Sequence, residues 1–178
     1  AGSGKTRVIV EKIAHLIQSG RYPAKHIAAI TFTNKAAREM RERVGKRISK
    51  SAAEAVTVTT FHSLGLKFLQ EECKQVGLRR GFSIFDSDDQ QGLIKDLLPP
   101  GADKDALFAA HSWISKVKNM ALAPEQAQQQ AKTVRERQIA ELYTRYQQRL
   151  SAFNAVDFDD LIRLPLQVLE GDAEARLR

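Results

Sequence analysis

The feature that most constrains this chain is the glycine-rich run at its start, Gly2-Ser3-Gly4-Lys5-Thr6, which leads directly into an apolar-periodic segment. A glycine-rich turn that ends in Lys-Thr and opens a helix is typical of the second half of a phosphate-binding P-loop, where backbone N–H groups face an anion. The glycines let the backbone approach phosphate oxygens, the lysine reaches the β- and γ-phosphates, and the threonine hydroxyl holds Mg²⁺.

The sequence therefore predicts a site for ATP and Mg²⁺ at the start of the chain. The predicted nucleotide-binding residues are Gly2, Ser3, Gly4, Lys5, Thr6 and Arg7, with Lys5 and Thr6 also assigned to catalysis and Thr6 to Mg²⁺. The complete motif needs a further glycine and a strand, which would precede Ala1. The alternative is a flexible polar N-terminus that precedes a helix.

Helices and strands alternate in the first half of the chain, which favours an α/β fold with a parallel sheet flanked by helices. Apolar residues at helical spacing predict helices, and short β-branched or apolar runs predict strands. The predicted order is a helix at 5–19, a strand at 26–32, a helix at 34–50, a strand at 55–60, a helix at 61–76 and an extended piece at 82–85.

From Asp86 to Phe153 the pattern is helical only, and a further helix is predicted to start at Val156. This change favours an incomplete RecA-like P-loop domain with an inserted all-helical subdomain. The predicted boundaries are 1–84 for the first part of the RecA-like domain, 85–153 for the insertion and 154–178 for the return to the RecA-like domain.

Both predicted strands of the first half end in an aromatic residue and polar neighbours. The first is followed by Phe32-Thr33-Asn34-Lys35, and the second ends in Thr60-Phe61-His62-Ser63. Ligands bind at the carboxyl edge of parallel strands, where an aromatic ring can stack on a base and polar groups can reach phosphates. The alternative is that Phe32 is core, that Asn34 caps a helix and that His62 is a structural hydrogen-bonding residue.

The net charge of +7 indicates a polyanionic partner. A single cysteine, Cys73, excludes an internal disulfide, fits a reducing cytosol and is interpreted as a small buried hydrophobe. No apolar run is long enough for a membrane span, and the sequence is expected to be cytoplasmic.

Two acidic clusters and one tryptophan have alternative interpretations. Asp86/Asp88/Asp89 and Asp157/Asp159/Asp160 could hold Mg²⁺, but both stand where helices begin, where Asp is favoured as a cap. Trp113 is expected in the core rather than on DNA. Lys118, close to Lys116 and Asn119, is predicted to lie in a basic, DNA-contacting end of the helical region.

Four segments in this order and spacing resemble the superfamily 1 DNA helicases of the UvrD/Rep/PcrA type, and among these the Rep type. They are residues 2–6, 29–40, 60–63 and 157–161, and the resemblance covers almost the whole chain. It implies ATP-driven 3′ to 5′ translocation on single-stranded DNA, coupled to unwinding of duplex.

By position, the resemblance assigns Lys5 and Thr6 to phosphates and Mg²⁺. It assigns Phe32, Thr33, Asn34, Lys35, Thr60 and His62 to single-stranded DNA. Expected partners are single-stranded DNA, single/double-strand junctions and replication or repair accessory proteins. The family's Asp-Glu pair and second motor domain do not occur in the 178 residues, so the chain alone is expected not to hydrolyse ATP.

Two other functions fit part of the sequence. A basic nucleic-acid-binding module with a vestigial P-loop would lack nucleotide affinity. A small-molecule P-loop kinase would yield a phosphorylated product and would not bind DNA with a steep salt dependence.

Overall fold

The computed structural model describes residues 4–176, which form two compact units, one ending at Leu64 and the other starting at Gly65. The predicted nucleotide contacts Gly2 and Ser3 lie outside the described residues. None of the helices in residues 4–176 combines the length and the apolar character needed to cross a membrane.

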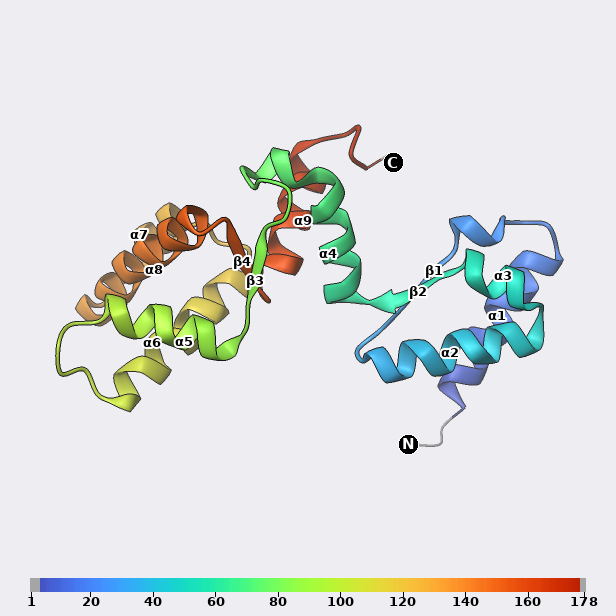
Figure 1. Cartoon of the computed structure of the whole chain (residues 1–178), viewed down its shortest axis with the longest axis horizontal. Helices are drawn as coiled ribbons and strands as arrows, with labels where there is room; N and C mark the ends of the chain where they lie inside the picture. The colour runs from blue at the N-terminus through green and yellow to red at the C-terminus, as the bar shows by residue number, and fades with distance from the viewer. Residues whose placement is uncertain (1–3, 177–178) are drawn as a thin grey trace. The chain divides into compact units, whose positions relative to one another are not determined.

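The first unit is built around two short parallel strands, β1 (Ala28–Thr31) and β2 (Thr57–Thr60), which lie side by side in Figure 1. Their register pairs Ala28 with Thr57 and Thr31 with Thr60. The other elements are α1 (Lys5–Gln18), the 3-10 turn η1 (Ala24–His26), α2 (Asn34–Arg47), α3 (Lys50–Ala55) and the start of α4 (Phe61–Glu72). Helix α2 packs against α1, α3 and β2.

The core of this unit forms because each helix buries one apolar stripe against the strands. Its buried members are Val10, Ile13, Ile27, Ala29, Ala37, Met40, Val44, Ala53, Val56 and Val58. Arg41 of α2 also contributes, since its Nη2 donates to the Val58 carbonyl oxygen over 2.6 Å and satisfies a backbone acceptor of β2.

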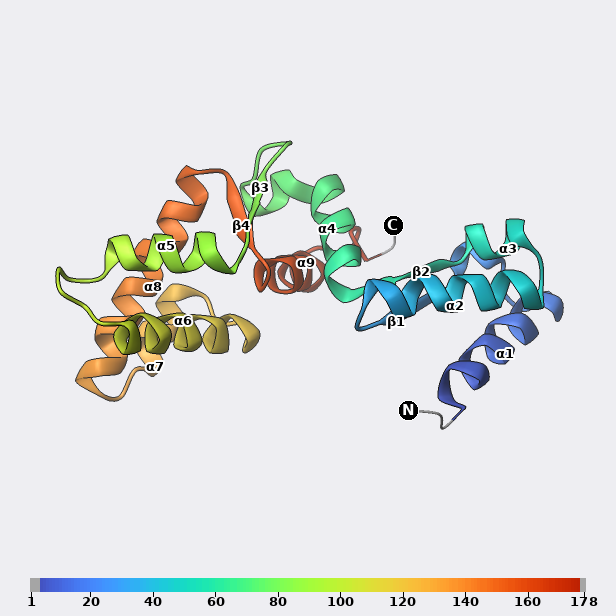
Figure 2. The same ribbon diagram turned by 60° about the horizontal axis from the view of Figure 1, so that its bottom comes forward.

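The second unit contains a second parallel pair, β3 (Ser83–Phe85) and β4 (Ala155–Asp157), and the chain between them is helical. These helices are α5 (Ser87–Leu97), α6 (Lys104–Asn119), α7 (Pro124–Gln130) and α8 (Val134–Ala152), preceded by η2 (Cys73–Val76) and followed by α9 (Asp160–Gly171). Helices α5, α6 and α8 contact one another, and α7 lies along α8, as Figure 2 shows.

Two apolar clusters stabilise the second unit. The larger one joins α5, α6 and α8 through buried residues such as Ile94, Ile114 and Tyr143, with Trp113 packed against it. The smaller one includes Leu69, Leu161 and the free thiol Cys73, so Cys73 is buried as expected. Helix α4 meets α9 closely, since a Cβ atom on Gly65 would stand only 1.7 Å from the Leu161 carbonyl oxygen.

The α/β class and the parallel pairing are confirmed, whereas two predicted elements are wrong. A strand, β4, occupies residues 155–157, where the start of a helix was predicted, because its backbone pairs with β3. The helix predicted over 34–50 ends at Arg47, and an unpredicted helix, α3, follows from Lys50 to Ala55, up to the start of the predicted strand at 55–60. The Ser49 hydroxyl caps α3 by accepting from the Ala52 N–H. The RecA-like assignment and the three predicted domain boundaries stay predictions.

Candidate functional site

The N-terminus of α1 leaves its first backbone N–H groups available to an anion. Gly4 precedes the helix in the left-handed region, with φ at 70°, which glycine adopts without strain. No side chain caps this helix end and no acidic residue lies in its first turn. Lys5 and Arg7 are exposed and Thr6 is half-buried, so the described part of the predicted P-loop fits a phosphate group.

A second group of predicted residues lies where β1 and β2 end. Because Thr31 pairs with Thr60, the residues that follow these strands emerge at one edge of the two-stranded sheet. Phe32, Asn34, Lys35 and His62 are all exposed there. The side chain of Phe32 is 92% exposed, so the alternative that it belongs to the core is wrong.

Two threonines at this edge hold the backbone turns. The Thr33 hydroxyl accepts from the Ala36 N–H over 3.1 Å and caps α2, so the alternative that Asn34 is the helix cap is wrong. Thr60 is buried, and its hydroxyl donates to Ser63 Oγ and accepts the Ser63 N–H. The prediction that Thr60 contacts DNA therefore needs correction, because its hydroxyl is bonded within the chain and shapes the start of α4.

Phe61, which follows β2 and is not among the predicted DNA-binding residues, also lies at this edge. Its ring is 50% exposed and its centroid lies 6.3 Å from that of Phe32. The sequence shows an aromatic residue after each of the two strands, and the strand register brings the two to the same edge.

The predicted DNA contact through Lys118 is wrong. This side chain is 1% exposed, and its ammonium group donates to Asp157 Oδ2 over 2.6 Å and to Asp160 Oδ2 over 2.9 Å. Arg163 also pairs with Asp160, and Tyr146 donates its hydroxyl to Asp157. Desolvation of a lysine is offset only by such close carboxylates, so Lys118 is a buried structural cation.

The two carboxyl groups of this cluster titrate differently. Burial raises the pKa of Asp157, and the negative charge of Asp160 raises it further, against the opposing effect of Lys118. At Asp160, burial acts in the same direction but is outweighed by Lys118 and Arg163, which hold its pKa below the usual range. Burial also raises the pKa of Tyr146, as does the neighbouring Asp157.

The metal alternative for the acidic clusters is not supported. Asp86 caps α5 by accepting from the N–H groups of Asp88 and Asp89, and Asp89 accepts the Asp86 N–H in return. Asp157 and Asp160 are paired with Lys118. Within residues 4–176 no group of three or more His, Cys, Asp or Glu side chains is placed to hold a metal ion.

Comparison with known proteins adds a family match and several relatives. The family model described as "UvrD/REP helicase N-terminal domain" matches residues 1–178. The chain is 46% identical over 180 residues to ATP-dependent DNA helicase Rep of Salmonella typhimurium and of Escherichia coli, covering 100% of this chain and 27% of each relative. It is 39% identical over 173 residues to ATP-dependent DNA helicase PcrA of Staphylococcus aureus, covering 96% of this chain and 24% of the relative. The chain thus spans about a quarter of the length of these relatives.

Proposed function

The chain belongs to the UvrD/REP helicase N-terminal domain family, and on this premise we propose that it forms the N-terminal part of an ATP-dependent DNA helicase. In this proposal Lys5, Thr6 and Arg7 bind ATP, and the edge formed by Phe32, Asn34, Lys35 and His62 binds single-stranded DNA. The observation that carries the DNA assignment is Phe32, a large apolar ring held 92% exposed beside exposed polar side chains.

The described P-loop residues have the chemistry that ATP requires. The open N-terminus of α1 and the Lys5 ammonium group supply positive potential for phosphate oxygens, and no carboxylate in the first helical turn opposes it. Thr6 is the residue that would hold Mg²⁺, which neutralises charge on the β- and γ-phosphates when bound.

Coupling between the two sites follows from their shared unit. The P-loop residues begin α1, which packs on α2, and α2 starts directly after the exposed Phe32 edge. A change at the phosphate site that moved α1 would therefore move α2 and the DNA-binding edge.

The proposal also includes 3′ to 5′ translocation, action at single/double-strand junctions, replication or repair accessory partners and a cytoplasmic location.

The test uses the full-length protein that contains this chain, with DNA-stimulated phosphate release and single-strand binding measured side by side. We expect Lys5→Ala to lower ATP turnover by at least about 100-fold, because it removes a charge aimed at phosphates, and to leave DNA affinity unchanged. Lys12→Ala is the matched control, since Lys12 is an exposed lysine on the same helix, two turns from its start. Normal turnover in Lys5→Ala would contradict the proposed nucleotide site. The expectation that the 178 residues alone are inactive stays a prediction.

A further inference from the structure

Phe32 and Phe61 form a pair of exposed rings that the β1–β2 register creates. Thr31 and Thr60 are paired as the last residues of their strands, so Phe32 and Phe61 are the next residues on each. Their centroids lie 6.3 Å apart and the rings are inclined by 52°. This is the spacing of an interacting aromatic pair in a tilted arrangement.

Most of the apolar surface of this pair is left in water. Phe32 is 92% exposed and Phe61 50% exposed, so nearly all of the first ring and half of the second are accessible to a ligand. Exposed rings alone do not mark a binding site, since Phe153 is exposed and paired as well, so the side chains around Phe32 and Phe61 decide what this pair can bind.

The neighbouring side chains indicate which ligand fits the rings. Residues 32–35 and 60–63 include an amide, a lysine and a histidine but no carboxylate. Lys35 and Asn34 are exposed beside Phe32, where they can reach a phosphate attached to a stacked base. A ligand with flat π-faces and an anionic backbone meets both requirements, and single-stranded nucleic acid has both.

We propose that Phe61 is a second base-stacking residue of the single-strand site, which acts together with Phe32. The 52° inclination excludes a parallel slot, so a base stacks on the face of one ring and meets the edge of the other. This inference rests on the proposed function, because it assigns a further contact within the proposed DNA-binding edge.

The experiment measures binding of the 178-residue chain to two oligonucleotides of equal length and charge, a thymidine oligomer and its fully abasic counterpart. We compare Phe61→Leu and Phe61→Ala with Phe32→Ala. Phe153→Leu is the matched control, because Phe153 is also an exposed ring in an aromatic pair, with Phe85 at 5.9 Å.

If Phe61 stacks on bases, both Phe61 variants lose about 5- to 150-fold in affinity for the thymidine oligomer and keep their affinity for the abasic one. Their salt dependence stays that of the parent chain, because no phosphate contact is removed. Equal losses on both oligonucleotides, or an affinity unchanged from that of Phe153→Leu, overturn the inference. If the Phe61 variants keep their affinity while Phe32→Ala loses base-dependent binding, only the inference about Phe61 fails. If Phe32→Ala also leaves base-dependent binding intact, the proposed DNA-binding edge fails as well.

Discussion

At Lys118 a positive charge is held inside the protein by two carboxylates. Its side chain and those of Asp157 and Asp160 are each at most 2% exposed, and a ring contact with Tyr146 at 5.2 Å completes the surroundings of the ammonium group. Removing these ions from water is costly, and the close pairing offsets the cost only while all partners are present. The cluster is therefore sensitive to the loss of any one charge.

We expect Lys118→Met to lower the free energy of unfolding by about 3–5 kcal/mol, because it leaves two buried carboxylates without their common partner. Lys116→Met is the control, since Lys116 is exposed on the same helix and should change stability by less than about 0.5 kcal/mol. Urea unfolding measures the free energy of unfolding of both variants, and the comparison holds when its dependence on urea concentration is the same in the two. Equal stability of the two variants would show that the buried pairing contributes nothing. Adding Asp157→Asn and Asp160→Asn to Lys118→Met should restore part of the loss.

At the scale of elements, α4 and α9 approach so closely that one position admits only glycine. A Cβ atom on Gly65 would lie 1.7 Å from the Leu161 carbonyl oxygen and 2.9 Å from its carbonyl carbon, both of which are backbone atoms that cannot turn aside. We expect Gly65→Ala to destabilise the chain by about 1–3 kcal/mol, since the helices must separate.

The control for this prediction is Gly92→Ala in α5, where an added Cβ meets no atom within 4 Å. This exchange should stabilise the chain by about 0.5–1 kcal/mol through helix propensity alone. Thermal unfolding of the two variants gives the comparison, and a gain in stability for Gly65→Ala would mean that α4 and α9 are farther apart than described.

Elements that depend on local pattern could be predicted from the sequence, and those that depend on distant pairing could not. Helix α1 has clear apolar periodicity, so its position agrees with the predicted helix at 5–19. The strand β4 is only three residues long, and its backbone pairs with β3, some 70 residues earlier in the chain. No local signal marks such a pairing, and the acidic residues that follow suggested a helix start instead.

The same reason explains the outcome at the candidate site. The exposed positions of Phe32, Asn34, Lys35 and His62 follow from their place after a strand, which the sequence shows. The burial of Lys118 depends on carboxylates 39 and 42 residues away, and a lysine near an asparagine at a helix end is ordinarily solvated. Long-range ion pairing of this kind leaves no trace in spacing or composition.

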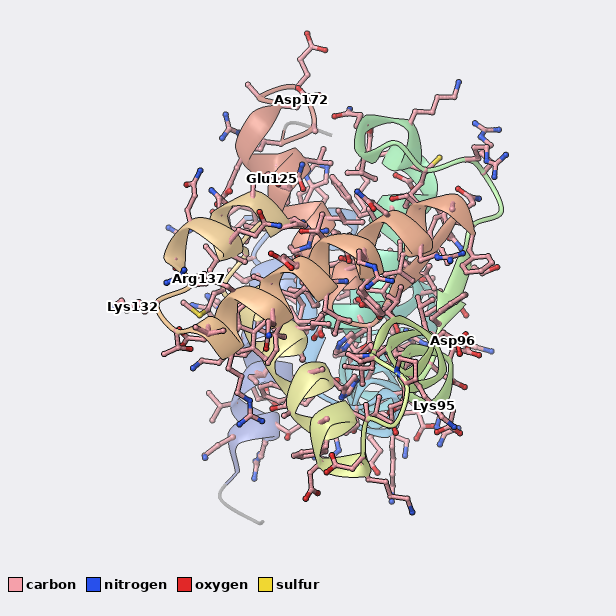
Figure 3. All side chains as sticks on the ribbon, turned by 90° about the vertical axis from the view of Figure 1, so that its left-hand side faces the viewer. Lys95, Asp96, Glu125, Lys132, Arg137 and Asp172 are labelled. Carbon is pink, nitrogen blue, oxygen red and sulfur yellow. The ribbon has the colours of Figure 1, made fainter. Side chains whose placement is uncertain are left out.

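At the scale of the whole molecule, the excess of positive over negative charge is confined to residues 1–64. Residues 1–64 contain 12 Lys and Arg against 4 Asp and Glu, a net charge of +8, whereas residues 65–178 contain 16 against 17, a net charge of −1. In the second part the charged side chains are mixed in sign, and Figure 3 shows Lys95, Asp96, Lys132 and Arg137 on its periphery. Attraction of a polyanion should therefore come from the first part.

We expect Lys35→Gln with Arg38→Gln to weaken binding of single-stranded DNA and to reduce the slope of log affinity against log salt by up to about 1.4, because each lost phosphate contact on a single strand removes about 0.7. The matched control is Lys132→Gln with Arg135→Gln, an exposed Lys and Arg at the same spacing and with the same loss of net charge. Binding titrations at a series of salt concentrations measure both slopes. If only net charge mattered, the two pairs would lower affinity equally, so equal loss would contradict a localised DNA-binding surface. A change confined to the first pair would place the phosphate contacts on α2, directly beside the exposed rings.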